Sequence, residues 1–219
     1  TQITIPSSTT GPHSIKASGT ATQAASAPEA SISINPNISL NRTGIAPGNS
    51  ITVTGSGFGP GESSISVTYD GNIVASNISA SSQGSWTSTF TVPQSISGSH
   101  SIKASGSTTQ AVSVPEVSLS IIPSISLSRT STAPGASLTI TGSGFGPNEA
   151  SITITYDGSP VATGISASAQ GAWTATFTVP PSTSGLHSIK ASGSVTQATS
   201  APEVNLSISP VISLSRSNA

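Results

Sequence analysis

Apolar and polar residues alternate with a period of two along most of this chain. In the second half, isoleucine, leucine, valine and aromatic residues occupy every other position of short runs. Such alternation turns one face of each run inward and the other outward, which is typical of β-strands in a half-buried sheet. The runs are 125–128, 138–141, 152–156, a shorter one around Val161, 173–179, 187–191 and a last one within 195–208.

Turn residues separate these runs, and apolar residues do not recur at helical spacing over any useful length. Ala133-Pro134-Gly135 follows the first run, and Asp157-Gly158 closes the third. Asp-Gly suits a tight hairpin turn because glycine tolerates positive φ. About seven short strands per unit, bounded by Gly, Pro and Asn, predict an all-β sandwich of the immunoglobulin-like kind.

The pattern repeats after 87 residues. The segment Gly-Ser-Gly-Phe-Gly-Pro starts at Gly55 and again at Gly142, and Trp86 corresponds to Trp173. Residues 38–124 align with residues 125–211 without a gap, and about 70% of the positions are identical. A fixed period of this length indicates one structural unit copied in tandem.

The phase of the repeat predicts the domain boundaries. Residues 1–37 match the end of one repeat, 38–124 and 125–211 are whole repeats, and 212–219 match the first strand of another. We therefore expect a window on a longer array, whose remaining parts would hold any signal peptide or anchor. Short junctions containing proline leave little room to flex, which predicts a semi-rigid rod.

Composition excludes several classes of function. Only 6% of residues are charged and the net charge is −1, too little positive charge for a nucleic-acid or anionic-membrane surface. The chain has no run of about 18 apolar residues, the length that a membrane-spanning helix needs. The chain contains neither Cys nor Met, so disulfides and thiolate chemistry are excluded, and nothing is readily oxidised. These absences suit an extracellular or cell-surface location.

Several residue strings resemble a known group of domains. Residues 139–149 read Thr-Ile-Thr-Gly-Ser-Gly-Phe-Gly-Pro-Asn-Glu and precede Tyr156-Asp157-Gly158, Gln170-Gly171-Ala172-Trp173 and Gly185-Leu186-His187-Ser188-Ile189. They are similar to the immunoglobulin-like repeats, close to the TIG type, of prokaryotic surface proteins. The resemblance covers essentially the whole chain and implies the fold. It implies no catalytic residue, since such repeats serve as stalks, filaments and adhesins alike.

The glycine-rich segment 55–61 is not a phosphate-binding loop. Such a loop needs a third glycine and a following helix, whereas Pro60 stands at that position and a strand is predicted next. We expect a bulged turn in which Phe58 and Phe145 plug the end of the sandwich.

The other aromatic residues have two interpretations. Trp86 and Trp173 share the alternation of predicted strands and are expected in the core, with an exposed sugar-stacking platform as the alternative. Tyr69 and Tyr156 precede the hairpin turns and are expected half-buried, with the hydroxyl at the rim.

No metal or other cofactor is predicted. Each repeat has one histidine and no cysteine, which is too few ligands for zinc, and calcium needs several convergent carboxylates. The histidines and the acidic residues each stand isolated in the sequence: His13, His100 and His187, then Glu62, Glu149, Asp70 and Asp157, and one glutamate before each final strand, Glu29, Glu116 and Glu203.

Two kinds of covalent modification remain open. Asn-X-Ser/Thr sequons would accept glycans outside the cell, although chance sequons are expected in so hydroxyl-rich a chain. They lie at Asn37, Asn41, Asn77 and Asn205. An intradomain Thr–Gln ester would tie the first predicted strand to the last, and the alternative is ordinary surface residues. The repeated pairs are Thr43 with Gln110 and Thr130 with Gln197.

The sequence favours a structural function over the alternatives. Near-identical repeats and stiff junctions predict a non-enzymatic extracellular stalk or filament, in which identical chains or neighbouring repeats associate. The alternative is an adhesin for a glycan or a cell-surface protein, whose tip loops would vary between copies. An enzyme is not predicted, because one repeat supplies no carboxylate pair, nucleophile–base arrangement or metal set.

Overall fold

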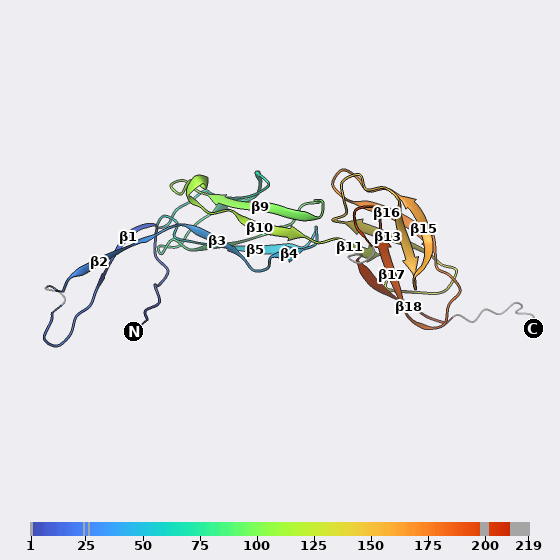
Figure 1. The fold of residues 1–219 in the computed structure, drawn as a ribbon, viewed down its shortest axis with the longest axis horizontal. Helices are drawn as coiled ribbons and strands as arrows, with labels where there is room; N and C mark the ends of the chain where they lie inside the picture. The colour runs from blue at the N-terminus through green and yellow to red at the C-terminus, as the bar shows by residue number, and fades with distance from the viewer. Residues whose placement is uncertain (1, 24, 26, 198–201, 211–219) are drawn as a thin grey trace, which may run out of the picture. The chain divides into compact units, whose positions relative to one another are not determined.

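The computed structural model describes residues 2–23, 25, 27–197 and 202–210. These residues form β-strands and a single turn of 3₁₀ helix, η1 (Ala111–Ser113) (Figure 1). The chain divides into two compact units, one of residues 1–43, 50–91 and 99–119, the other of residues 44–49, 92–98 and 120–219. In the described part of the chain, no helix has the length and apolar character needed to cross a membrane.

The first unit begins with a separate hairpin. Strands β1 (Gly11–Lys16) and β2 (Glu29–Ile34) pair antiparallel, with Lys16 opposite Glu29. The Nζ of Lys16 lies 3.2 Å from Oε2 of Glu29. Ile15 corresponds by the 87-residue offset to Ile102, a fully buried core residue, but it is only half-buried in the hairpin.

Residues 37–121 form a first sandwich of two sheets. The smaller sheet has the order β3-β5-β8 and the larger sheet the order β4-β10-β9-β6-β7. The strands are β3 (Asn37–Leu40), β4 (Gly44–Ile45), β5 (Ser50–Ser56), β6 (Ile65–Tyr69), β7 (Asn72–Ile78), β8 (Trp86–Thr91), β9 (Gly98–Ser105) and β10 (Val117–Ile121).

Residues 124–208 form a second sandwich with the same sheet orders, β11-β13-β16 and β12-β18-β17-β14-β15. Each strand has a counterpart in the first sandwich about 87 residues earlier. The strands are β11 (Ser124–Leu127), β12 (Ser131–Thr132), β13 (Ser137–Ser143), β14 (Ile152–Tyr156), β15 (Ser159–Ile165), β16 (Trp173–Thr178), β17 (Gly185–Ser192) and β18 (Glu203–Ile208).

The all-β fold class is confirmed, but one strand was not predicted and another was predicted too long. The predicted first run, 125–128, corresponds to β11, which pairs antiparallel with β13, whereas the unpredicted β12 pairs parallel with β18 in the other sheet. The additional strand gives eight strands per sandwich where about seven were predicted. The last strand begins at Glu203 and not at Val195, because the backbone N–H groups of Val195 and Thr196 donate to the side chain of Glu149. Residues 198–201 of the predicted strand lie outside the described residues.

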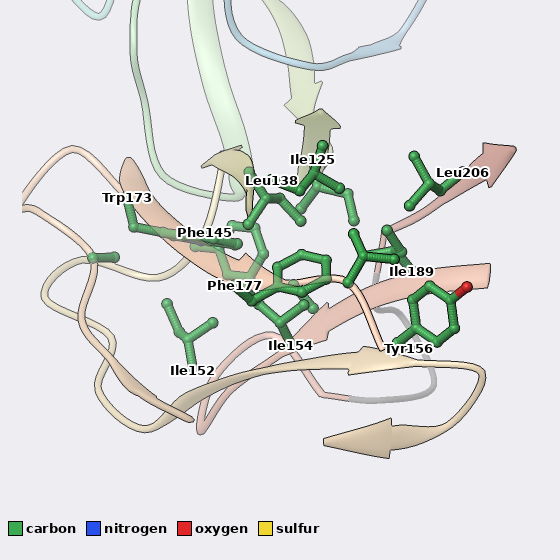
Figure 2. Close-up of a cluster of buried hydrophobic side chains, with 14 of the residues drawn as sticks. Ile125, Leu138, Phe145, Ile152, Ile154, Tyr156, Trp173, Phe177, Ile189 and Leu206 are labelled. Atoms are coloured by element: carbon green, nitrogen blue, oxygen red, sulfur yellow. The ribbon is translucent and has the colours of Figure 1, made fainter. Parts of the chain in front are cut away.

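The core lies between the two sheets of each sandwich, and Figure 2 shows it for the second one. Leu138, Ile140, Ile154 and Ile189 are fully buried, as the alternation predicts for inward positions. The smaller sheet contributes Leu138 and Ile140 and the larger sheet Ile154 and Ile189. Burying large aliphatic and aromatic side chains in this way is the main force that holds two sheets together.

The tryptophans and phenylalanines are buried as predicted. Trp173 is 5% exposed and Phe145 is fully buried, with the two rings edge to face at 5.2 Å. The Trp173 ring covers Gly142 on the neighbouring strand, where any Cβ would collide with the indole. Trp86, Phe58 and Gly55 repeat the arrangement in the first sandwich. The tyrosines are more buried than predicted, since Tyr69 and Tyr156 are each 5% exposed.

The hairpin turn predicted at Asp157-Gly158 is confirmed. Asp157 and Gly158 have φ values of 48° and 81° between β14 and β15. Positive φ at both central positions suits the right-handed twist of the flanking strands. Asp70 and Gly71 form the same turn between β6 and β7, with φ values of 47° and 81°.

Candidate functional sites

The most buried charged group of the first sandwich is the carboxylate of Glu62, which is 5% exposed. Its Oε2 accepts hydrogen bonds from the backbone N–H of Gly59 at 2.8 Å and from Oγ1 of Thr109 at 2.6 Å. Its Oε1 accepts from the backbone N–H groups of Thr108 at 2.7 Å and Thr109 at 2.6 Å. The carboxylate therefore joins the loop before β6 to the connection after β9.

Glu149 makes the same four contacts in the second sandwich and is 2% exposed. The donors are the N–H of Gly146 at 2.8 Å, of Val195 at 2.8 Å and of Thr196 at 2.6 Å, and Oγ1 of Thr196 at 2.9 Å. We call each arrangement, Glu62 with its donors and Glu149 with its donors, a glutamate clasp. The prediction that these two glutamates are isolated was wrong.

The clasps keep their glutamates charged. Burial raises the pKa of the Glu62 carboxyl, but the hydrogen bonds from Thr109, Thr108 and Gly59 outweigh it and lower the pKa to about 2. The pKa of Glu149 is lowered in the same way, against burial, by Thr196, Gly146 and Val195. A carboxylate that already accepts four hydrogen bonds and stays ionised is a poor general base or electrophile, so the clasp is a structural device.

Glycines make room for the clasp. A Cβ at Gly193 would collide with Oε1 of Glu149, and one at Gly106 would collide with Oε1 of Glu62. The sequence carried a signal for this contact, because a glutamate after Gly-Phe-Gly-Pro and a Thr-Gln pair recur together in both repeats. This recurrence identifies the residues but does not show that they contact each other.

A second repeated contact joins Asp157 to His187. Nδ1 of His187 lies 2.6 Å from Oδ2 of Asp157, and Nε2 lies 2.9 Å from the carbonyl oxygen of Thr183. Both acceptors lack a proton, so both ring nitrogens donate and the imidazole is protonated in this geometry. The bond to Asp157 accordingly raises the pKa of His187, and His187 lowers the pKa of Asp157.

The same pair occurs in the first sandwich. Nδ1 of His100 lies 2.6 Å from Oδ2 of Asp70, whose Oδ1 accepts from the N–H of Ser101 at 2.9 Å. Burial raises the pKa of Asp70, but the bonds from His100 and Ser101 outweigh it. The prediction that these aspartates and histidines are isolated was therefore also wrong.

Tyrosine rings cover these histidines. Tyr69 stacks on His100 at 5.1 Å and Tyr156 on His187 at 5.0 Å. The hydroxyl of Tyr156 lies 2.8 Å from Oγ of Ser182, which donates to the carbonyl of Pro180. Since neither ring nitrogen of His187 faces a nucleophile, the His–Asp pair fixes a turn and lacks the geometry of a catalytic triad.

Three lysine–glutamate pairs occupy equivalent positions on the outer surface. The Nζ–Oε2 distances are 3.2 Å for Lys16–Glu29, 3.3 Å for Lys103–Glu116 and 3.1 Å for Lys190–Glu203. Glu203 also accepts from Oγ of Ser188 at 2.6 Å. The side chains are nearly half exposed, and pairs of this kind contribute little to stability.

The residues of the predicted ester link do not lie in strands. Thr43 lies in the bend between β3 and β4, and Thr130 lies in the bend between β11 and β12. Gln110 directly precedes η1, and Gln197 lies between β17 and β18. Their predicted placement in the first and last strands was therefore wrong.

The two members of each pair also lie at opposite ends of a strand. The carbonyl of Thr130 accepts from the N–H of Ser207, which lies opposite Leu186 near the start of β17. Gln197 follows Thr196, whose carbonyl accepts from the N–H of Gly193 just beyond the end of β17. The rise of a strand puts about 20 Å between those ends. The ester stays a prediction that this arrangement does not support.

All four sequon asparagines are exposed, so each is accessible to a modifying enzyme. Asn37, Asn77 and Asn205 lie in β3, β7 and β18, and Asn77 has a φ of 58°. Oδ1 of Asn41 accepts from the N–H of Thr52 at 3.0 Å, a contact that Ser128 makes to Thr139 in the second sandwich. Glycosylation remains a prediction.

Two further findings bear on binding. All eight aromatic residues of the chain are at most 5% exposed, so the described surface offers no aromatic platform for a sugar. Among the residues that the structure describes, no three His, Asp or Glu side chains gather in a group that could hold a metal ion. The alternative of an exposed tryptophan platform is contradicted by this burial.

One family model matches the part of the chain that holds the second sandwich. Residues 120–208 match the IPT/TIG domain. The predicted resemblance to TIG-type immunoglobulin-like domains is confirmed for this part of the chain. Comparison with curated protein sequences gives no match.

Solved structures with a similar arrangement include three bacterial proteins. The adhesin InvE of Yersinia pseudotuberculosis is 13% identical over 80% of this chain and 58% of its own, with a TM-score of 0.37. InvD of the same species is 15% identical over 84% and 61%, with a TM-score of 0.33.

The third is SGBP-B of Bacteroides ovatus, solved with a mixed-linkage heptasaccharide. It is 14% identical over 84% of this chain and 50% of its own, with a TM-score of 0.35. The chain thus spans less than two thirds of each of these three proteins. With every one of these TM-scores below 0.5, the likenesses carry no conclusion about function.

Proposed function

We propose that this chain is part of an extracellular structural protein, in which immunoglobulin-like sandwiches form a cell-surface stalk or filament. The observation that carries the proposal is the repetition of the polar contacts. The glutamate clasps and the His–Asp pairs recur with the same partners in both sandwiches. Polar side chains that could act on a substrate are instead committed to holding turns and loops in place.

The surface chemistry supports the same proposal. Strands β13 and β16 of the smaller sheet point only serine and threonine outward, and β5 and β8 do the same. Hydroxyl groups solvate a surface without adding charge, and the absence of Cys and Met leaves nothing readily oxidised. Both properties suit long exposure outside a cell.

Immunogold labelling of the source cells tests this proposal. Antibodies raised against the purified chain should label intact, unpermeabilised cells, with gold particles along surface appendages or at a constant height above the envelope. Labelling that requires permeabilised cells would contradict an extracellular location.

The rod-like arrangement and self-association are finer parts of the proposal. The junction sequence Ile122-Pro123-Ser124 is short and contains proline, which supports a stiff connection between domains 38–124 and 125–211. Small-angle X-ray scattering of the purified chain should show an elongated particle. Electron microscopy of concentrated protein should show end-to-end assemblies, and isolated short monomers would count against the filament.

An adhesin for a glycan or a cell-surface protein is the second candidate. Its support is the variation at one turn, where Asn72-Ile73 corresponds to Ser159-Pro160 and Ile73 is 67% exposed. The burial of every aromatic ring argues against sugar stacking. Glycan binding on an array that persists in Ile73→Ser would mean that another surface makes the contact. An array without hits would favour the structural function over a glycan adhesin.

A further inference from the structure

The larger sheet of each sandwich ends in an edge strand that differs between the two copies. In the described chain, β7 and β15 are the last strands of these sheets, next to β6 and β14. The open side of an edge strand presents backbone N–H and C=O groups to which a further strand can pair, and proteins usually block it. At one position of this edge, β7 has Ile73 where β15 has Pro160.

The hairpin register determines where the backbone of Ile73 points. Around the turn Asp70-Gly71, Tyr69 lies opposite Asn72 and Thr68 lies opposite Ile73. The pair that closes a two-residue turn exchanges hydrogen bonds and the next pair does not, because the two kinds of pair alternate along an antiparallel ladder. The N–H and C=O of Ile73 therefore point away from β6, towards the open side of β7.

Pro160 occupies the same position in the second sandwich, where it lies opposite Thr155 of β14. The turns that precede the two strands have nearly the same φ values, so the hairpins share one conformation. Proline has no N–H, and within a sheet it is confined to positions whose N–H side faces solvent. The open side of β15 is therefore closed to a further strand at this position, and that of β7 is not.

The chemistry of β7 also permits pairing. None of the residues of Asn72–Ile78 is charged, whereas edge strands are commonly protected by lysine. The side chain of Ile73 is 67% exposed. A register shift after Ile73 limits the regular part of the strand, so any added strand makes a short contact centred on this residue.

We propose that β7 pairs antiparallel with β7 of a second copy of this chain, about a two-fold axis at Ile73. The axis places Ile73 opposite its own copy, so each backbone N–H donates to the other's carbonyl and the two exposed side chains cover each other. A second copy fits this edge because the strand carries no charge that would repel it. The pairing specifies the self-association in the proposed function and rests on it only for its use in a filament.

Analytical ultracentrifugation of the whole chain measures the dissociation constant of the dimer. The chain is expressed without N-glycosylation, because the sequon Asn77 lies in the same strand. Ile73→Pro introduces the residue that the second sandwich already carries at this position, so the hairpin should tolerate it, and thermal unfolding checks this. The matched control is Leu186→Ser, which removes another exposed apolar side chain away from both edges.

The unaltered chain should show a monomer–dimer equilibrium that depends on concentration. Ile73→Pro should raise the dissociation constant at least about tenfold, because it removes the paired hydrogen bonds at the centre of the contact. Ile73→Thr keeps the N–H and should raise the constant less. Pro160→Ile opens the second edge and should produce species larger than a dimer. Leu186→Ser should leave the constant unchanged.

Two results would overturn the pairing. One is an unaltered chain that stays monomeric at the highest concentration reached, which would leave the exposed Ile73 to the adhesin alternative. The other is an equal dissociation constant for the unaltered chain and Ile73→Pro, which would place the dimer contact elsewhere. Immunogold labelling of intact cells depends on neither result, so the pairing and the proposed extracellular function fail separately.

Discussion

Glu62 and Glu149 combine two properties that rarely occur together, because each carries a charge and each is almost fully buried. The cost of removing a carboxylate from water is several kcal/mol, and the four charge-assisted hydrogen bonds that each accepts, worth roughly 1.5–3 kcal/mol apiece, offset it. The pKa of both groups is lowered, so the hydrogen bonds outweigh the effect of burial. At the scale of single residues, the stability of the loops therefore depends on these carboxylates.

Replacing Glu149 by glutamine should destabilise the second sandwich by about 2–4 kcal/mol, since an amide nitrogen would then face donors that need an acceptor. Urea denaturation followed by tryptophan fluorescence measures the change. Glu203→Gln is the matched control, because it alters an exposed glutamate in the same sandwich, and its midpoint should stay close to that of the unaltered chain. Equal midpoints for the two variants would refute the role of the clasp.

Acid should weaken the sandwiches through the same carboxylates. The pKa of Glu62 is about 2 in the folded chain and 4.5 without the fold, so its contribution is present above pH 4.5. That contribution is lost as the pH falls from 4.5 to about 2. The urea midpoint, measured at pH values from 6 to 2, should fall in this window, and it should fall less in Glu62→Gln.

The His–Asp pair should respond to pH in the opposite sense. The pKa of His187 is raised above 6.5, so its contribution is complete below pH 6.5 and is lost as the pH rises through the raised value. NMR titration of the His187 ring should give a lower pKa in Asp157→Asn than in the unaltered chain, because the largest cause of the raised pKa is removed. An identical titration curve in the variant would show that Asp157 does not hold the imidazole in its charged form.

At the scale of elements, the period-two alternation explains most of the strands. Leu138 and Ile140 point into the core while Thr139 and Thr141 face outward, as a pleated strand requires. The additional strand β12 is different, because Arg129 and Thr130 before it carry no pattern that distinguishes one sheet from the other. Only pairing with β18, about 78 residues away, selects the parallel position of β12.

The Gly142–Trp173 contact makes a prediction about strand packing. Gly142→Ala should destabilise the second sandwich by about 1–3 kcal/mol, because the new methyl group would displace the buried indole. Gly19→Ala is the control, since a Cβ at Gly19 meets no atom within 4 Å. Thermal unfolding followed by near-ultraviolet circular dichroism compares them, and a loss of stability in Gly19→Ala as large as that in Gly142→Ala would contradict the packing argument.

At the scale of the whole molecule, the domain boundaries predict which residues fold as one unit. Each sandwich has its own two sheets, its own buried Phe–Trp pair and its own clasp. We therefore expect residues 125–211, expressed alone, to fold and to unfold in one cooperative transition. Denaturation curves from fluorescence and circular dichroism should coincide, and a broad non-cooperative curve would show that the boundary is misplaced.

The sequence by itself determined the all-β class, the 87-residue period, the inward positions and the Asp-Gly turns. Each of these follows from local patterning, because a strand must bury alternate residues wherever it lies. The tertiary structure alone decided that Glu149 meets Thr196, that Asp157 meets His187 and that β12 lies beside β18. Those partners are 47, 30 and about 78 residues apart, and contacts over such separations depend on how the sheets pack.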